Sequence, residues 1–485
     1  MLILLLLLLP LAGAILTFLM GSKSASLSRN IALGTSLVSF VIWLVAFNAF
    51  RAGDTAALSF HQSWIASYNL HFSFVVDGFA LVLVGLVSVL IPLIILSTAK
   101  LTYDKANVFY ALILSTAFAL VGVFTAKDIF LFYFFFEVAL VPVYFLALGW
   151  GGASAPKITF KMFVYTIFGS LFMLVAFVYL YSKGQTADMD ALLNTVGVLP
   201  ARSQNILFWA FMLAFAIKMP LFPFHTWQPD AYTESPTPAT MLLSGLLSKM
   251  GVFGLIRIAL PFAPASISGY ANVVIFFAVV GLIYGSIIAI KQDNIKRLVA
   301  YSSFAHMGLM AAGVMSGTLE GLQGAIYQML AHGINAVGLF FIIKIIFERT
   351  GSRSLSSLGG MTQSAPALSI YFMIILLGSV ALPLTNGFVG EFLLLKGVFD
   401  QNSLLGILAG LTIILGAAYM LRLFQKTMFG PTTENTVAIA DVSGTESIVL
   451  FVISALVIVM GVFPNVLLKI TEPSASALIN YLAEF

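Results

Sequence analysis

The chain has 485 residues, of which 60% are hydrophobic and only 9% charged, and its mean hydropathy is +1.05. Soluble domains carry about 25% charged residues, so this composition excludes a soluble enzyme and indicates a protein buried in lipid. The net charge of +4 matters less than where the charges lie. The absence of cysteine excludes disulfides, cysteine-held iron–sulfur clusters and cysteine zinc sites from this chain.

Apolar runs of about 20 residues, the length that crosses a bilayer as a helix, recur along the whole chain. They predict an all-α membrane protein with one integral membrane domain over residues 1–485 and about fourteen transmembrane helices. The first run has no positive charge ahead of it, so we interpret it as a retained span and not as a cleaved signal peptide. The predicted spans are 1–20, 31–50, 76–98, 107–126, 128–150, 159–182, 205–227, 239–262, 271–291, 296–316, 321–347, 366–398, 402–427 and 447–469.

Lysine and arginine are distributed unevenly between the two sides of the predicted membrane. Segments after odd-numbered spans hold thirteen of them, with Lys296 in this set, and the opposite side holds six, with Arg257 in that set. Positive residues are enriched in cytoplasmic loops, so the larger set is predicted to face the cytoplasm. Both termini then face the outer side.

Several ionisable residues fall inside the predicted spans, where a charge costs roughly 3 kcal/mol on insertion scales. Lys249 is the eleventh residue of its span, which places it about 15 Å along the helix. Lys344 and Lys396 lie within about one turn of span ends and are expected to extend to the interface. The candidate site consists of six residues, Glu137, Lys218, Lys249, His306, His332 and Glu391.

Two interpretations of these buried groups are open. Glu137 and Lys218 could form an ion pair that holds two helices together. Replacing buried ion pairs by apolar residues is often neutral or stabilising, so stability alone explains such a pair poorly. Ionisable groups on six different spans instead favour a proton relay.

Two of the predicted spans contain residues that interrupt a helix. Pro220 and Pro223 lie in the seventh, and the segment 383–390 lies in the twelfth. Proline removes a backbone donor, and freed backbone groups at membrane depth need protein or water as partners. Breaks five spans apart predict two five-helix repeats, the second inverted because five is odd, an arrangement typical of transporters. The predicted division is 1–106 (spans 1–3), 107–262 (spans 4–8), 271–427 (spans 9–13) and 447–469 (span 14).

Four segments carry a specific pattern: FHTWQPDAYTESPTPATMLLSGLLSKMGVFGLIRIALP at 224–261, KQDNIKRLVAYSSFAHMG at 291–308, QMLAHGINAVGLFF at 328–341 and FVGEF at 388–392. They resemble the antiporter-like membrane subunits of respiratory complex I, NADH:quinone oxidoreductase. The resemblance covers nearly the whole chain. It is strongest to the M type, because the related L and N types place lysine where this chain has Glu391. The family implies fourteen spans, in agreement with the count above.

The resemblance implies a proton-translocating subunit of a larger translocase, and it assigns a role to each residue of the candidate site. The implied roles are a tuning carboxylate (Glu137), a proton carrier (Lys218), a linking lysine (Lys249), two further links (His306 and His332) and an exit-side group (Glu391).

The redox chemistry of such a complex is expected outside this chain. The sequence has no glycine-rich dinucleotide fingerprint after a strand and no metal-ligand cluster. NADH, FMN, iron–sulfur clusters and quinone are therefore expected in partner subunits, with no cofactor, metal or nucleic acid bound here. Homologous antiporter-like subunits are expected on either side within the bilayer. The implied location is a bacterial inner (plasma) membrane, with both termini on the periplasmic side.

Other functions fit part of the sequence. A subunit of a multi-subunit sodium/proton antiporter, or of a membrane-bound hydrogenase complex, shares the fold and most motifs. A b-type cytochrome could use His306 and His332 as haem ligands, but the buried lysines would then be unexplained. A membrane scaffold would need no charges at mid-membrane.

Overall fold

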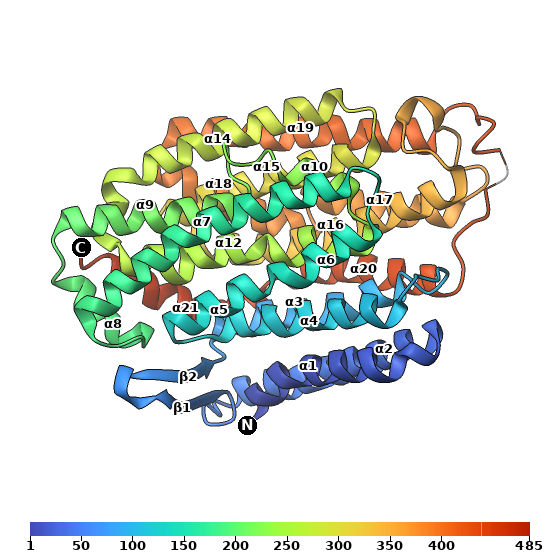
Figure 1. The fold of residues 1–485 in the computed structure, drawn as a ribbon. Helices are drawn as coiled ribbons and strands as arrows, with labels where there is room; N and C mark the ends of the chain where they lie inside the picture. Colours follow the sequence, from blue (N-terminus) through green and yellow to red (C-terminus); the bar gives the residue numbers. More distant parts are fainter. Residues whose placement is uncertain (438) are drawn as a thin grey trace.

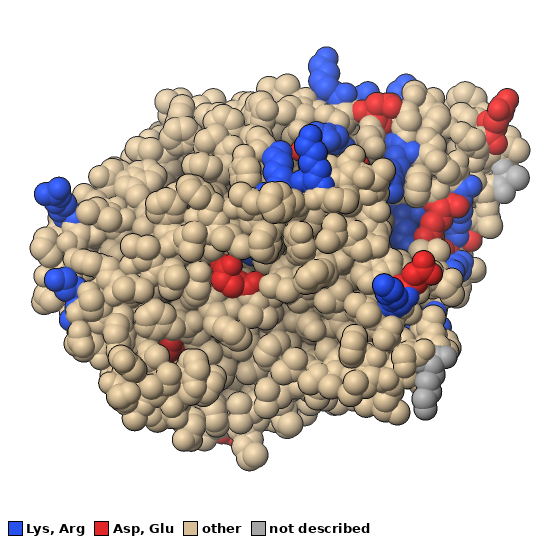
Figure 2. Space-filling view, in the orientation of Figure 1, with Lys and Arg blue, Asp and Glu red and all other residues tan. Residues whose placement is uncertain are grey.

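The computed structural model describes residues 1–437 and 439–485, and most of them form long helices that run side by side (Figure 1). Within these residues twelve helical stretches are long and apolar enough to cross a membrane. Figure 2 shows a mostly uncharged surface, with the charged side chains concentrated in the right-hand half of the view. The twelve stretches are α1 (Leu2–Met20), α2 (Ala25–Arg51), α3 (Gly78–Leu96), α4 (Ala106–Thr125), α5 with α6 (Ile129–Val138 and Leu140–Trp150), α7 (Ala155–Gly184), α11 to α13 (Thr237–Phe262), α14 with the turn before it (Pro264–Lys291), α15 (Ile295–Met315), α16 (Leu319–Thr350), α19 (Ser403–Met428) and α20 (Thr445–Val462).

The seventh and twelfth predicted spans are interrupted helices. The seventh is α9 (Ala201–Lys218), followed by a non-helical segment and the short α10 (Gln228–Glu234). The twelfth is divided into α17 (Pro366–Ser379) and α18 (Asn386–Gln401). The total of fourteen spans and the inverted repeat stay predictions.

Each break follows from its residues. Helix α9 ends at Lys218, two residues before Pro220, because proline supplies no N–H and its ring clashes with the preceding turn. The second break covers 380–385 and so begins earlier than the sequence predicts. Within it Ala381 and Leu384 have positive φ values of 55° and 71°, an uncommon conformation for residues with side chains.

The structure agrees with the predicted all-α membrane class, and it adds one short hairpin that the sequence did not predict. Strand β1 (Ser59–Ile65) pairs antiparallel with β2 (Leu70–Val75) in the connection between α2 and α3. Asn69, with φ 50°, supplies the left-handed turn residue between the strands. The hairpin lies outside the layer of helices, beside the start of α1 (Figure 1). The His71 N–H donates to Asp128 Oδ2 at 3.4 Å, which ties the hairpin to the N-cap of α5.

The C-terminal end also differs from the prediction. The last span was expected over 447–469, but α20 ends at Val462, and α21 (Asn465–Leu482) follows Pro464 as a separate helix. Proline cannot continue the hydrogen-bond ladder of α20. Helix α21 packs on the start of α3, where a Cβ added to Gly78 would lie 2.2 Å from the Ile470 carbonyl oxygen.

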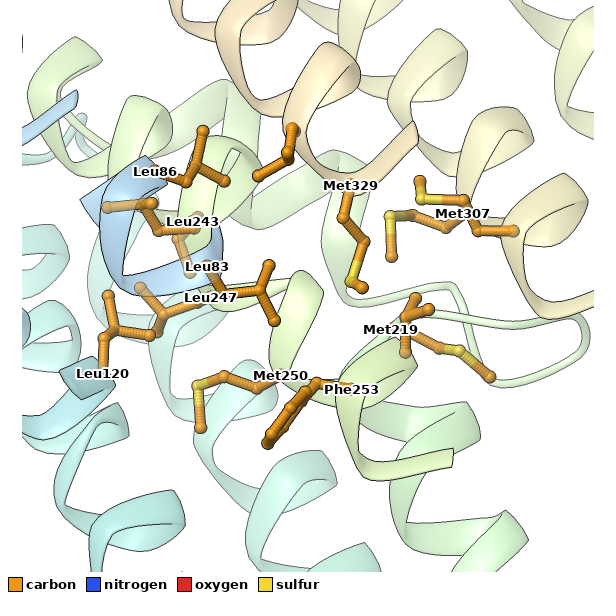
Figure 3. Packing of buried hydrophobic residues seen from close by; sticks show 14 of the residues in the cluster. Leu83, Leu86, Leu120, Met219, Leu243, Leu247, Met250, Phe253, Met307 and Met329 are labelled. Atoms are coloured by element: carbon orange, nitrogen blue, oxygen red, sulfur yellow. The ribbon is translucent and has the colours of Figure 1, made fainter. Parts of the chain in front are cut away.

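The centre of the molecule consists of α15, α16 and the stretch α11–α13, whose residues are almost all buried. Apolar side chains fill the space between these elements, and Figure 3 shows Met219, Met250, Met307 and Met329 in this packing. Helices α1, α2, α7, α14, α19 and α20 are more exposed. An ionisable residue on a central helix is therefore surrounded by apolar side chains and helix backbone.

Candidate functional site

Lys249 lies at the centre of the candidate site and is fully buried. Its ammonium nitrogen is 2.5 Å from the Ser244 carbonyl oxygen, 2.7 Å from His332 Nδ1 and 3.3 Å from Ser248 Oγ. A π-helical turn, Leu243–Leu247, lies just before it. Such turns are frequent at functional sites. Here the Ser244 carbonyl accepts a hydrogen bond from a side chain five residues later.

His332 extends the line of contacts from α16 to α15 and α18. The ring centroids of His332 and His306 are 5.6 Å apart. His306 Nδ1 lies 3.2 Å from Glu391 Oε1, within ion-pair distance although not aligned as a hydrogen bond. Gln328, one helical turn before His332, donates to the same oxygen at 3.5 Å. Lys249, His332, His306 and Glu391 therefore form one chain of neighbours.

Lys218 and Glu137 form a second part of the site. Lys218, the last residue of α9, is buried, and its Nζ lies 4.8 Å from the centroid of the Phe136 ring. Glu137, the residue after Phe136 on α5, is half-buried. No ion pair joins them in the described part of the chain. The described contacts therefore do not support the interpretation that a direct Glu137–Lys218 ion pair holds the two helices together.

Glycines bring the two lysine-bearing helices together. A Cβ added to Gly251 on α12 (Lys249–Gly254) would lie 2.7 Å from the Met219 backbone nitrogen, and one at Gly254 would lie 2.2 Å from the Phe215 ring. Real Cβ atoms are not found this close to other heavy atoms. The end of α9, which carries Lys218, can therefore pack directly on the turn that follows Lys249.

Four buried polar atoms in this region have no hydrogen-bond partner among the described residues: His225 Nδ1, Gln228 Oε1, His306 Nδ1 and Gln328 Oε1. His225 lies within the break after α9 and Gln228 directly after it, and the other two residues lie beside Glu391. Buried polar groups are nearly always hydrogen-bonded, so these atoms add unused hydrogen-bonding capacity on both sides of the site. The sequence analysis did not predict His225 as a site residue. The only indication of it in the sequence is its position between Pro223 and Trp227, in the interrupted span.

Lys296, the first residue of the predicted span 296–316 and counted among the cytoplasmic charges, is not exposed. It is buried in α15, and its ammonium donates to the carbonyl oxygens of Ser235 at 2.5 Å and Thr233 at 3.1 Å, at the end of α10. Asn294 is the N-cap of α15, and its side chain accepts from the Lys296 and Arg297 N–H groups. An Asn at an N-cap is a common start of a helix, and here it begins α15 one residue before Lys296.

Two further basic residues have partners that the sequence did not reveal. Arg257, counted among the charges of the outer side, lies within the α11–α13 stretch and pairs with Asp77 at 2.5 Å. Lys344, expected at the interface, is buried and pairs with Glu348 at 2.9 Å. Lys396 is exposed, as expected.

The chain is similar to known proteins along nearly its whole length. The family model described as NADH:quinone oxidoreductase/Mrp antiporter, TM, matches residues 126–417. NADH-quinone oxidoreductase subunit M of Rickettsia prowazekii (strain Madrid E) is 37% identical over 467 residues, which cover 96% of this chain and 95% of that protein. Subunit M of Rhodobacter capsulatus is 34% identical over 494 residues, with 98% and 96% covered.

Solved structures agree with these relatives. A chain of respiratory complex I from Thermus thermophilus with bound NADH has a TM-score of 0.91 and 32% identity, and the match covers 99% of this chain and all (100%) of that one. A chain of the Mrp complex from Dietzia sp. DQ12-45-1b has a TM-score of 0.85 at 20% identity, over 99% of this chain and 52% of that one, and it supports the fold alone. Sequence and fold together show that the chain belongs to the family of NADH-quinone oxidoreductase subunit M, the antiporter-like membrane subunits of respiratory complex I.

Proposed function

We propose that this chain translocates protons across the membrane as a subunit of NADH:quinone oxidoreductase. The observation that carries the proposal is the chain of neighbours from Lys249 through His332 and His306 to Glu391. Lysine, histidine and glutamate can each gain and lose a proton. Side chains at these separations can transfer a proton from one to the next.

The cost of burying these groups supports transport over a structural role. A charge at mid-bilayer costs roughly 3 kcal/mol on insertion scales, and such residues usually mark ion pathways. Lys249 has carbonyl, hydroxyl and imidazole partners, and no acidic residue in the described part of the chain lies within hydrogen-bond distance of it. An ion-pair strut would need an acidic partner, whereas a site that holds a proton for a limited time does not.

Lys218 and Glu137 supply a second proton-holding site beside the first break. We infer that Glu137 favours the protonated form of Lys218 and that separation of the two releases the proton toward Lys249. The close packing of α9 on α12 supports this direction of transfer. Glu391 on α18, at the other end of the chain of neighbours, is the exit-side group.

The wider arrangement belongs to the same proposal. Fourteen spans would consist of the twelve long helices and the two broken ones, with spans 4–8 and 9–13 as inverted repeats. Homologous subunits would flank the chain in the membrane, and NADH, FMN, iron–sulfur clusters and quinone would lie in partner subunits. Both termini would face the periplasm.

The test is NADH-driven proton pumping by the intact complex in membrane vesicles, with assembly followed on native gels. Glu137→Gln and Lys218→Ala are each expected to reduce pumping severely and leave assembly largely intact, and Glu137→Asp to be milder because it keeps the charge. Lys183→Ala, at an exposed lysine of the same chain, is the matched control. Wild-type pumping by both neutralising variants would refute the relay.

A further inference from the structure

Two buried asparagines form hydrogen bonds between α16, which carries His332, and α18, which carries Glu391. Asn335 Nδ2 donates to Asn386 Oδ1 at 3.1 Å, and Asn386 Nδ2 donates to Asn335 Oδ1 at 3.2 Å. Asn335 is 4% exposed and Asn386 is 0% exposed. Each amide satisfies the other, so this reciprocal pair, which we call the amide clamp, is a specific polar lock inside an apolar core.

The amide clamp lies at a mechanically important position. Asn386 is the first residue of α18, directly after the second break, and Glu391 follows five residues later on the same helix. Asn335 lies on α16, three residues after His332, and with Gln328 the two occupy one face of that helix. The clamp therefore joins the helix that carries Glu391 to the helix that carries His332.

Helices α16 and α18 run antiparallel and touch at a series of levels. A Cβ at Gly324 would meet the Leu394 backbone nitrogen at 2.7 Å, and one at Gly390 would meet Gln328 Oε1 at 2.3 Å. These glycine contacts fix the distance between the helices. They offer no directional bond that would prevent α18 from sliding or turning, whereas the two hydrogen bonds of the amide clamp do.

The segment before the clamp is strained and needs such a lock. Ala381 and Leu384 both hold positive φ values, a conformation that costs free energy for residues with side chains and persists only where the surroundings enforce it. Leu384 is 70% exposed, so its own side chain contributes little packing. The clamp begins two residues later, where the chain returns to a helix.

We propose that Asn335 and Asn386 are positioning residues that hold α18 in register against α16 and thereby fix Glu391 beside His306. The proposal rests on the proposed function of Glu391 in proton transfer. The two asparagines need not carry the proton. They keep the His306–Glu391 separation at 3.2 Å, and a misplacement of about 1 Å can cost up to about a hundredfold in rate.

Leucine variants of the intact complex test this proposal, because leucine has nearly the shape of asparagine without its polar atoms. Asn335→Leu or Asn386→Leu alone leaves one buried amide unpartnered, which is costly, whereas the double variant leaves none. Two measurements are made on each complex: the Glu391–His306 distance by cryo-electron microscopy, and the protons pumped per NADH. Ser454→Ala, at a buried serine on α20, is the control.

The double variant is expected to assemble, to show a longer Glu391–His306 distance, and to pump fewer protons per NADH, because misplacement slows transfer through this chain and removes the share of protons that it moves. An unchanged distance in the double variant would overturn the proposal. If the double variant fails to assemble, Asn386→Ser is used instead. Serine keeps a hydroxyl but cannot form the reciprocal pair of hydrogen bonds. A longer Glu391–His306 distance in this variant would support the proposal, and an unchanged distance would overturn it.

Glu391→Gln, measured alongside, separates this proposal from the proposed function. A longer distance in the double variant with normal pumping by Glu391→Gln would support the positioning role and refute the role of Glu391 in transport. Reduced pumping by Glu391→Gln with normal pumping by the double variant would overturn the amide clamp as a positioning device.

Discussion

Lys249 and His332 are too close for both to hold a proton. Their nitrogen atoms are 2.7 Å apart, and two unit charges at this distance repel by about 6 kcal/mol at an effective dielectric constant near 20. Moving one charge across 200 mV costs about 4.6 kcal/mol. A proton that arrives on Lys249 can therefore expel a proton held by His332 toward His306 and Glu391, against a membrane potential of that size.

His332→Gln removes this repulsion while its amide oxygen can still accept a hydrogen bond from Lys249. The expected result is an assembled complex in which Lys249 keeps its proton and pumping falls steeply. If only about a third of the repulsion, roughly 2 kcal/mol, acts at the transfer step, proton release slows about thirtyfold.

The assay measures protons moved and NADH oxidised in the same vesicles, so that loss of pumping is distinguished from loss of turnover. His61→Gln, at an exposed histidine on the hairpin, serves as the control and is expected to behave as wild type. A His332→Gln complex that assembles and pumps the wild-type number of protons per NADH would refute this reasoning.

Two further predictions concern packing and ion pairs. Glu446 accepts from Arg349 at 2.7 Å and lies 2.9 Å from Lys100, so Glu446→Gln weakens a charge-assisted hydrogen bond to a partly buried arginine. We expect a loss of about 2 kcal/mol, measured as a lower midpoint of thermal dissociation, and an unchanged midpoint would contradict the assigned network. Gly251→Ala places a methyl group against the Met219 backbone. The resulting overpacking, about 1–3 kcal/mol, should reduce the amount of assembled complex on native gels. Normal assembly after mild heating would show that the helices can separate without cost.

The sequence by itself determined the class of the protein and supplied the candidate site residues. Hydropathy over about 20 residues and the disruption of helices by proline are local properties, so the long helices and the end of α9 near Pro220 followed directly. A charge inside an apolar run is likewise visible without a structure, and for this reason Lys249 and Glu391 could be named in advance.

Which side chains meet was decided only by the tertiary structure. Lys249 and His332 are 83 residues apart in the chain, and their contact depends on how two helices are rotated. One residue turns a helix by about 100°, so a small error in rotation moves a side chain to another face. The Asn335–Asn386 pair depends on the same rotation, and each residue alone reads as an ordinary polar residue in a helix. Burying a polar or charged side chain costs free energy wherever it lies. Its role, as an ion pair, a proton-transfer group or a hydrogen-bonded contact between helices, depends on the partner that packing places within about 3 Å.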